Sequence, residues 1–309
     1  MSDATVNAAA AAAAEASDSV AAGAPLISLD HVTVEFGRGK NRFRAVDDVS
    51  LTINKGSIYG IIGFSGAGKS TLVRTMNVLQ RPTSGTVTFN GTTISTLGEG
   101  RLLPLRRKIA MIFQHFNLMP SRTVLDNVTL PLIHEKVSRK DARAKAMHLL
   151  ELVGIADKAK AYPRQLSGGQ QQRVAIARAL ITKPSLVFAD EPTGNLDSVS
   201  SAEVLSFLKR SVKELGQTVI MVTHDAVAAS YADRAIVFAD GQIVADEQRP
   251  TAESMNQLLM NERERATQLV GGPSAGTTVP RPPVAALKGH TEKASFVPGA
   301  PSVPGAPQH

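Results

Sequence analysis

A nine-residue stretch carries the residue types and the spacing of a phosphate-binding loop. Residues 63–71 read Gly-Phe-Ser-Gly-Ala-Gly-Lys-Ser-Thr, which fits the pattern G-x-x-x-x-G-K-[ST]. Glycines let successive N–H groups point at polyphosphate oxygens, and a helix beginning near Lys69 would add the positive end of its dipole. Lys69 would reach the β- and γ-phosphates, and the Ser70 hydroxyl would complete a Mg²⁺ shell. The alternative is a plain glycine-rich turn.

Acidic and imidazole side chains follow two continuous apolar runs farther along the chain. The run 184–189 ends in Asp190 and Glu191, and the run 218–223 ends in His224. Asp190 could hold Mg²⁺ through water, and Glu191 could orient the attacking water and accept its proton. His224 could donate to the γ-phosphate as charge develops. The alternatives are an exposed turn for the two carboxylates and a structural role for the histidine.

Two further segments bear on the same chemistry. Gln114 ends the short apolar run 108–113 and could meet the metal or the water, although a glutamine in this position is weak evidence alone. Residues 166–170, Leu-Ser-Gly-Gly-Gln, precede an expected helix over 171–180. Glycines at a helix N-terminus make an anion site. Residues 166–170 would thus form a second anion site, here called the second cradle, beside that of the phosphate loop. One nucleotide rarely needs two such sites.

The apolar runs indicate the elements that position these residues. Continuous apolar strands are typical of a parallel sheet buried on both faces, and the run 57–62 before the phosphate loop is a third such strand. Ligands bind outside the carboxyl ends of the strands in open α/β sheets, so the polar residues should converge on the loop. Further strands are expected at 27–36, 43–53 and 85–91, which would form an antiparallel sheet, and at 235–238 and 242–245, which would form a hairpin. Helices are expected at 71–79, between 117 and 163, and at 252–269. The helical pattern between 117 and 163 is clearest where one face is shared by Ala142, Ala146, Leu149, Leu150 and Val153.

Composition bounds the class of protein. The chain has 309 residues, 43% of them hydrophobic, and no cysteine, which excludes disulfides and thiolate zinc sites. No basic region precedes an apolar signal segment and no run is long enough to span a membrane, so we expect a protein that is neither secreted nor integral. The formal charge of +7 is spread among acidic neighbours, which favours a mixed solvated surface. Residues 1–25 and 271–309 lack a periodic apolar pattern and are expected to be disordered.

The motifs together resemble those of the ATP-binding cassette family. The phosphate loop, the pentapeptide 166–170, the strand ending in Asp190-Glu191 and the strand ending in His224 occur in the family's order and spacing, within residues 27–248. The resemblance implies an α/β P-loop NTPase fold with an antiparallel β subdomain and an inserted α-helical subdomain at about 115–165. It also implies an ATPase that binds ATP and Mg²⁺ and releases ADP and phosphate.

The same resemblance implies a head-to-tail homodimer with two ATP molecules between the subunits. The phosphate loop of one subunit would face Ser167, Gly168 and Gly169 of the other, which would explain the second cradle. Residues 195–197 would form the loop that crosses the interface, and Gln114 would open the segment that senses a membrane partner. Phe36 aligns with the aromatic residue that stacks on adenine; a core phenylalanine is the alternative.

These arguments define the expected site. The catalytic residues are Lys69, Gln114, Glu191 and His224; the nucleotide-binding residues are Phe36, Gly63, Ser65, Gly66, Ala67, Gly68, Lys69, Ser70, Thr71, Ser167, Gly168, Gly169, Gln170 and Asp197; and the metal-binding residues are Ser70, Gln114 and Asp190. The cassette is expected over 26–248, followed by a helix over 249–270.

Sequence around the motifs narrows the resemblance. Residues 58–83, 106–118 and 121–124 are similar to the ATPase subunits of methionine importers. Residues 191–197, Glu-Pro-Thr-Gly-Asn-Leu-Asp, instead resemble lipoprotein-releasing, macrolide-exporting and cell-division ATPases, so an exporter, lipoprotein-release or cell-division ATPase is the alternative. Many methionine-importer subunits carry a ligand-sensing α/β domain after the cassette. Here a helix and a Pro/Gly-rich tail follow, so feedback inhibition by internal methionine through such a domain is not expected.

We therefore expect the ATPase of an importer of methionine or a related amino acid, bound peripherally at the cytoplasmic face of the cell membrane. Its expected partners are an integral membrane permease and an extracytoplasmic substrate-binding lipoprotein. A soluble cassette ATPase acting on DNA or ribosomes is a hypothesis from another class. The sequence has no long coiled-coil insertion, no cysteine-based zinc module and no second cassette, so no nucleic-acid partner is expected.

Overall fold

The computed structural model describes residues 23–135 and 137–271. Its centre is a six-stranded sheet in the order β10-β9-β3-β8-β7-β6, in which β10 alone is antiparallel to its neighbour. The strands are β3 (Ile58–Ile62), β6 (Ile109–Ile112), β7 (Leu186–Asp190), β8 (Val219–Thr223), β9 (Arg234–Ala239) and β10 (Gln242–Gln248). The parallel strands and the β9–β10 hairpin predicted from the apolar runs are confirmed.

Alternate residues of the central strands point to two separate cores. In β8, Val219 and Met221 pack with the helices on one face, whereas Ile220 and Val222 pack with the second sheet on the other. Because both faces are covered, each residue of β3 and β8 is buried, which explains the continuous apolar runs. The sheet is therefore the layer that fixes the positions of the loops at its strand ends.

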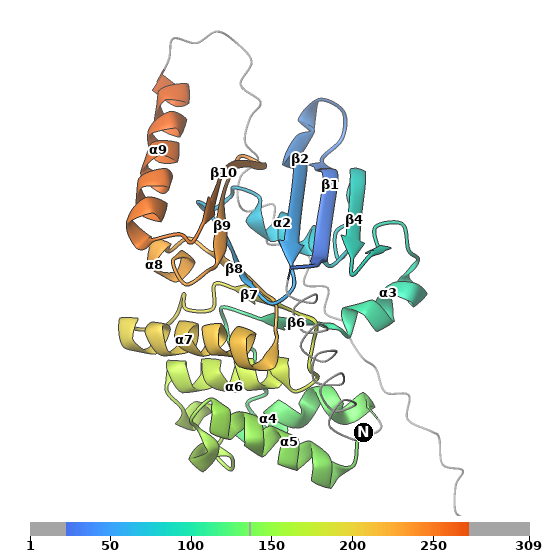
Figure 1. The fold of residues 1–309 in the computed structure, drawn as a ribbon, viewed down its shortest axis with the longest axis vertical. Coiled ribbons are helices and arrows are strands. Elements are labelled where there is room, and N and C mark those ends of the chain that lie inside the picture. The colour runs from blue at the N-terminus through green and yellow to red at the C-terminus, as the bar shows by residue number, and fades with distance from the viewer. Residues whose placement is uncertain (1–22, 136, 272–309) are drawn as a thin grey trace, which may run out of the picture. The chain divides into compact units, whose positions relative to one another are not determined.

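The second sheet is antiparallel, as predicted, with the order β2-β1-β4-β5. Its strands are β1 (Pro25–Phe36), β2 (Phe43–Asn54), β4 (Ser84–Phe89) and β5 (Thr92–Thr93), with a short 3₁₀ turn at Gly39–Asn41 between the first two. Figure 1 shows β1, β2 and β4 standing side by side beside α2 (Lys69–Met76). The leader predicted over 1–25 is corrected at its end, because β1 already begins at Pro25; residues 1–22 lie outside the described part.

The predicted helical insertion is present between β6 and β7. It contains α4 (Val124–Thr129), α5 (Arg139–Leu152) and 3₁₀ turns at Leu130–His134, Ala156–Lys158 and Pro163–Gln165. Ser138 caps α5 by accepting a hydrogen bond from the amide of Asp141. The face predicted from the spacing of Ala142, Ala146 and Leu149 is buried. In Figure 1, α4 and α5 lie under α6 (Gly168–Leu180), on the side of the sheet away from β1 and β2.

The helix after the phosphate loop is shorter than the sequence predicts. We expected it to run to Leu79, but α2 ends at Met76 and Val78 has a φ of +55°. In a continuing helix the Val78 oxygen would accept from residue 82, which is proline and has no N–H; Arg106, at the end of α3 (Glu99–Arg106), donates to this oxygen at 2.7 Å. This carbonyl is held by a guanidinium instead of by a continuing helix.

The remaining helices are α7 (Ser198–Leu215), α8 (Ala226–Ala229) and α9 (Ala252–Gly271), the last of which covers the helix predicted near 252–269. Met255 and Leu259 of α9 pack against α8 and β9 in a third, smaller core. None of the helices in the described residues is both long enough and apolar enough to span a bilayer. The tail predicted from 271 onwards lies outside the described residues beyond Gly271.

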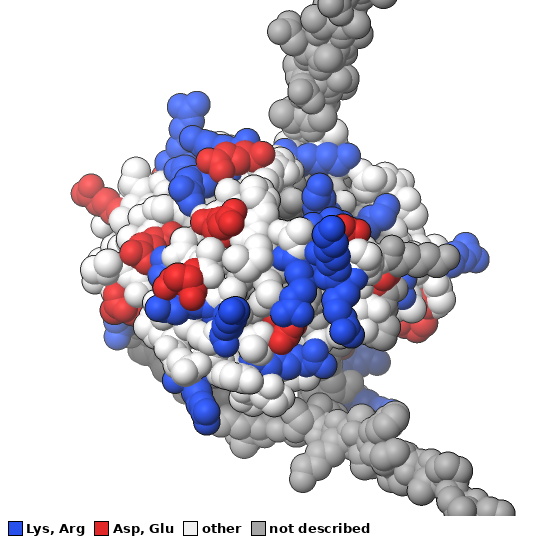
Figure 2. Space-filling view, turned by 90° about the horizontal axis from the view of Figure 1, so that it is seen from below, with Lys and Arg blue, Asp and Glu red and all other residues white. Residues whose placement is uncertain are grey.

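The described surface carries both signs of charge, and they are unevenly placed. Figure 2 shows the face that carries the helical insertion, where Lys and Arg gather on one side and Asp and Glu lie mainly on the other. Helix α5 supplies exposed Arg139, Lys140, Arg143 and Lys145. The mixture of charges expected from the sequence is therefore accompanied by a local excess of positive charge.

Candidate functional site

The polar residues predicted to converge follow three neighbouring strands. β8 lies between β3 and β7, and all three are parallel. Ile62 at the end of β3 is paired with Thr223 at the end of β8, and Asp190 at the end of β7 is paired with Val222. The phosphate loop, the Asp190-Glu191 pair and His224 therefore leave the same edge of the sheet.

Close backbone packing explains two of the loop glycines. A Cβ on Gly63 would lie 2.1 Å from the Phe238 oxygen, and one on Gly68 would lie 2.1 Å from the Ala45 oxygen. Gly68 also has a φ of +104° as the N-cap residue of α2. The sequence assigned these glycines to phosphate binding alone, but they are equally required to fit the loop between β2 and β9.

Lys69 occupies the hollow of the loop. Its Nζ donates to the backbone oxygens of Gly63 at 2.7 Å and of Phe64 at 2.9 Å, and the residue is 8% exposed. Loss of solvent lowers the pKa of Lys69, and attraction to Glu191 and Asp190 opposes that shift. The ammonium of Lys69 is thus buried, bonded to two carbonyl oxygens and attracted by two carboxylates. This environment fits a polyphosphate, which would supply a direct anionic partner for the ammonium.

The carboxylates stand in strained and desolvated positions. Desolvation raises the pKa of Asp190, repulsion from Glu191 adds to the shift, and Lys69 and Arg74 oppose it. Glu191 has a φ of +48°, uncommon for a residue with a side chain, and its side chain is 17% exposed. His224 Nδ1 lies 2.8 Å from Glu191 Oε1. The structure thus joins the predicted base and the predicted histidine directly.

The predicted metal-binding residues are of mixed types. Ser70 is exposed at the first turn of α2 and Asp190 is half-buried at the end of β7, so a hydroxyl and a carboxylate are offered at one edge of the sheet. Oxygen ligands in small number suit Mg²⁺, which keeps several waters. Within residues 23–135 and 137–271 there is no cluster of three or more His, Cys, Asp or Glu side chains arranged to hold a metal.

Gln114 contacts the loop before α7. Its Nε2 lies so close to Gly194 that a Cβ there would approach it to 2.8 Å, and its backbone oxygen accepts from Asn195 Nδ2 at 3.0 Å. Asn195 also lies 3.2 Å from His115 Nδ1. The structure brings Gln114 to residues 194–195, and its approach to the metal or the water stays a prediction.

The second cradle is built into α6. The helix begins at Gly168, three residues before the predicted start at Gln171, because Ser167 forms a capping box with Gln170. Ser167 accepts from the Gln170 amide at 3.3 Å, and the Ser167 amide donates to Gln170 Oε1 at 3.1 Å. Gly168 and Gly169 therefore lie in the first helical turn, where amides lack intrahelical partners. Ser167 is exposed in the single chain.

Gly169 is required by the packing of α6 on α7. A Cβ at this position would lie 2.7 Å from Ser200 Oγ. That hydroxyl donates to Asp197 at 2.8 Å, and the Ser200 amide also donates to Asp197, which caps α7 and whose pKa these donors lower. The structure thus gives Asp197 a role within its own chain that the sequence did not predict.

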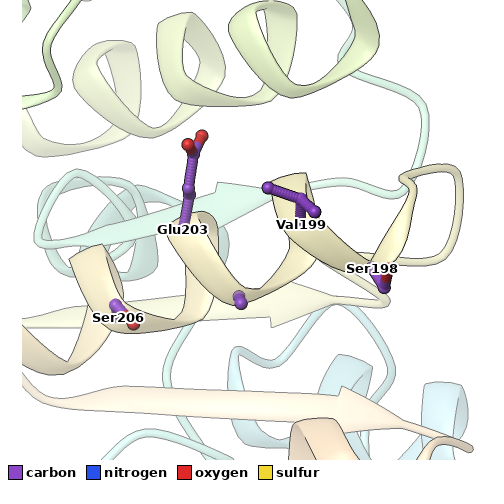
Figure 3. Close-up of a pocket in the computed structure, with 5 residues that line it drawn as sticks. Ser198, Val199, Glu203 and Ser206 are labelled. Carbon is purple, nitrogen blue, oxygen red and sulfur yellow. The ribbon is translucent and has the colours of Figure 1, made fainter.

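The two helices are also joined by an ion pair on their surface. Figure 3 shows a shallow hollow on α7 lined by Ser198, Val199, Ala202, Glu203 and Ser206. Glu203 reaches Arg173 of α6 at 3.2 Å, and Val199 is 69% exposed. The hollow contains none of the predicted site residues, although it begins one residue after Asp197.

Phe36, the predicted adenine contact, is half-buried at the end of β1. Its ring stacks on Phe43 with 5.6 Å between centroids and 29° between planes. It also packs at the margin of the core under the antiparallel sheet. Phe36 is therefore partly covered by the core and by Phe43, and its contact with adenine stays a prediction.

A groove of about 620 Å³ lies between the helical insertion and the edge of the central sheet. It is lined by Arg107, Ile109, Ala110, Met111, Phe113, Asn117, Leu130, Pro131, Glu135, Arg178, Ala179 and Thr182. Arg178 of α6 donates to the backbone oxygens of Phe116 and Asn117, which follow Gln114. The wall of the groove is therefore bonded to the segment that Gln114 opens.

Sequence reasoning missed residues that connect the motifs. Gln172, Arg178 and Ser200 were not singled out, and each contacts a motif from a distance in sequence. For Gln172 a signal existed: it precedes Ile176 by four residues and Ala179 by seven, the spacing of one buried helical face. The other two depend on which helices meet, which the sequence alone does not give.

Comparison with known proteins identifies the family. A family model described as ABC transporter matches residues 46–194. A dimeric ATP-binding cassette solved in a post-hydrolysis state with ADP and Pi is 38% identical, with a TM-score of 0.66 over 72% of this chain and 99% of that one. A cassette of a cbiONQ transporter complex from Clostridium perfringens is 27% identical, with a TM-score of 0.68 over 79% of this chain and 95% of that one. The chain belongs to the ATP-binding cassette family of ABC transporters.

Within that family the chain is similar to proteins described as methionine import ATP-binding proteins. It is 50% identical to one from Lactiplantibacillus plantarum, over 74% of this chain and 64% of the relative. One from Bifidobacterium longum is 49% identical over 81% and 63%, and one from Rhodococcus jostii is 46% identical over 79% and 75%. The chain thus spans less than two thirds of the length of the first two relatives.

Proposed function

We propose that this chain is the ATP-hydrolysing subunit of a membrane transporter that imports methionine or a related amino acid. The observation that carries the proposal is the convergence of the phosphate loop, Asp190-Glu191 and His224 at the ends of three neighbouring parallel strands. The similarity to methionine import ATP-binding proteins supports the substrate class and favours import over export.

Binding of ATP begins at the phosphate loop. Lys69 would exchange its two carbonyl partners for β- and γ-phosphate oxygens, and the loop amides would surround the phosphates. Ser70, Asp190 and Gln114 would hold Mg²⁺, which when bound neutralises charge on the phosphate oxygens. Phe36 would stack on the adenine, supported on its other side by Phe43.

Glu191 would act as the general base on the attacking water. Its hydrogen bond with His224 fixes the directions of both side chains. A neutral imidazole that donates from Nδ1 to Glu191 has no proton on Nε2, so His224 would need a second proton or a turn of its ring to donate to the γ-phosphate. The hydrogen bond therefore makes orientation of Glu191 the first role of His224.

A second copy would complete each site. Ser167 is exposed, and the amides of Gly168 and Gly169 in the first turn of α6 have no partner within the helix. In a head-to-tail homodimer the cradle of one copy would close over the γ-phosphate held by the other. The related cassette that was solved as a dimer supports this arrangement.

The groove between the helical insertion and β6 would receive a cytoplasmic helix of the permease. Its lining mixes apolar side chains with Arg107, Glu135 and Arg178, which suits an amphipathic helix. The chain would thereby attach peripherally to the cytoplasmic face of the membrane, and an extracytoplasmic lipoprotein would deliver the substrate. ATP would favour the closed dimer, and hydrolysis would release it.

Phosphate release by the purified chain tests the enzymatic half of this proposal. Glu191→Gln should bind ATP and accumulate a closed dimer while turnover falls to a small residual rate, because an amide cannot accept the proton. Glu203→Gln, which removes an acid from the outer side of α7, is the matched control and should hydrolyse ATP normally. Turnover by Glu191→Gln at the rate of the control would remove Glu191 from its role.

Reconstitution tests the transport half. Proteoliposomes are prepared with the copurified membrane partner in the bilayer and the cassette facing the lumen. They should take up labelled methionine only when ATP is enclosed in the lumen, and unlabelled methionine should compete with this uptake. Outward movement of substrate, or full ATPase activity with no membrane partner retained, would contradict the importer assignment.

A further inference from the structure

One buried glutamine connects three of the motifs. Gln172 lies in α6, five residues after Ser167, which is about 7.5 Å along the helix axis. It is fully buried, at 0% exposure. The neighbouring Gln170 and Gln171 are half-buried, so the three consecutive glutamines have different environments.

The amide of Gln172 is bonded to the backbone on either side of the predicted chemistry. Its Nε2 donates to the Pro192 oxygen at 2.7 Å, and Pro192 directly follows Glu191. The same nitrogen lies 3.5 Å from the Phe113 oxygen, and Phe113 directly precedes Gln114. Gln172 therefore touches the backbone beside both residues expected to handle the attacking water.

This arrangement is costly for a residue that only fills the core. Gln172 Oε1 is buried and has no hydrogen-bond partner among the described residues. An unpaired buried amide oxygen destabilises a fold, and an apolar side chain of similar volume would avoid that cost. Ile176 and Ala179, which share its helical face, belong to the apolar core.

The backbone that Gln172 holds is one that needs support. Glu191 has a φ of +48°, which persists only where its surroundings fix it. Its amide donates to the Val222 oxygen at 2.9 Å and its oxygen accepts from Gly194 at 3.0 Å. The hydrogen bond from Gln172 to Pro192 adds a third fixed point, and this one comes from the helix that begins at the second anion cradle.

We propose that Gln172 is a positioning residue that sets the place of Glu191 relative to the start of α6. The inference rests on the proposed function. A phosphate that docks at the first turn of α6 would act on the Pro192 carbonyl beside Glu191 through Gln172, which lies in the same helix. Hydrolysis of the ATP held by one copy would then depend on the docking of that copy's own cradle on the ATP of the other copy, although Gln172 itself would touch neither nucleotide nor water.

The test is Gln172→Met in the full chain, with Gln217→Met as the matched control. Gln217 is likewise a buried glutamine with an unpaired Oε1, and it precedes β8 at the end of that strand away from His224. We expect kcat of Gln172→Met to fall at least about tenfold, as for a small misplacement of a reacting group. Its ATP dissociation constant should stay within about threefold of wild type, and the control should retain its kcat.

A second readout separates positioning from general loss of structure. In a Glu191→Gln background, Gln172→Met should cause no further fall in the residual rate, because the group it positions is gone. An independent fall in that background, or equal losses in Gln172→Met and the control, would overturn the proposal. Gln172→Asn, whose shorter amide withdraws from Pro192, should reproduce the loss of kcat if the Met variant fails to fold; failure of both to fold would assign Gln172 to core stability and overturn it also.

The proposal and the function on which it rests fail in different ways. A wild-type chain that hydrolyses no ATP, alone or with its membrane partner, would refute the proposed function. An active wild type with an unaffected Gln172→Met would leave that function intact and refute the positioning role alone.

Discussion

Gly169→Ala should force α6 and α7 apart. The added Cβ would lie 2.7 Å from Ser200 Oγ and 2.8 Å from Ser200 Cβ, distances that side chains do not tolerate. Ser200 cannot turn away freely, because its hydroxyl and its amide both donate to Asp197 at the start of α7. The clash is therefore passed to the helix backbone and to the cap.

The magnitude follows from two opposing effects. Overpacking costs about 1–3 kcal/mol, whereas replacement of glycine by alanine in a helix gains up to about 1 kcal/mol. A net loss of about 1–2 kcal/mol would lower Tm by about 2–8 °C for a domain of this size. At Gly168 the same change meets Leu196 Cδ2 at 3.4 Å, Phe116 Cζ at 3.6 Å and the Asn195 oxygen at 3.7 Å, all ordinary contact distances, so Gly168→Ala should melt at or above the wild-type temperature.

Thermal unfolding of the nucleotide-free chain, followed by circular dichroism, measures the difference. In a Ser200→Gly background, Gly169→Ala should cost much less than in wild type, because the atoms it would strike are absent. The close contact between α6 and α7 is not what requires glycine if Gly169→Ala and Gly168→Ala have the same Tm. The same conclusion follows if Gly169→Ala lowers Tm equally in the wild-type and the Ser200→Gly backgrounds.

Three further substitutions test the site. Asp190→Asn should raise Tm at neutral pH in the absence of nucleotide. A carboxyl whose folded pKa is raised contributes stability below its ordinary pKa of 3.8 and loses that contribution as pH rises through the folded pKa, so the advantage of the variant should shrink towards about pH 4. Mg²⁺-ATP should stabilise the variant less than it stabilises wild type. Lys69→Met should weaken ATP binding at least about tenfold in calorimetry, because it removes the counter-charge of the phosphates; unchanged affinity would contradict the assignment. Phe36→Ala should lose the roughly 1–3 kcal/mol of a base–aromatic stack while Phe36→Tyr keeps it, and equal affinities of both variants for ATP would place Phe36 in the core alone.

The sequence predicts the layout of the site because its signals are local. Apolar runs that end in Asp190 or His224 mark both a buried strand and the edge at which it ends, and the phosphate loop fixes which edge matters. Because the strands are parallel, their carboxyl ends lie at the same edge of the sheet, and no long-range contact has to be known to predict that these ends meet. The hydrogen bond between His224 and Glu191 is a direct result of β7 and β8 being neighbours.

What the sequence could not predict depends on contacts between distant segments. The backbone that follows α2 is bonded at Val78 by Arg106, which lies 28 residues farther along the chain, and no local pattern predicts that bond. The sequence predicts a start for α6 that is three residues too late, because glycine has a low helix propensity, which the capping box at Ser167 overrides. Gly63 and Gly169 appear as ligand-binding glycines in the sequence, whereas their packing partners, Phe238 and Ser200, become visible only in three dimensions.

Four destabilising features of the described fold lie near one edge of the central sheet. Lys69 is a desolvated ammonium, Asp190 a carboxyl that its surroundings disfavour as an anion, Glu191 a residue at positive φ, and Gln172 an amide with an unpaired oxygen. All four adjoin the ends of β3, β7 and β8. A ligand that supplies phosphate oxygens and a divalent cation would relieve the first two at once, so its binding free energy would appear as stability of the closed form. The same residues that weaken the empty protein would therefore couple the presence of nucleotide to its conformation.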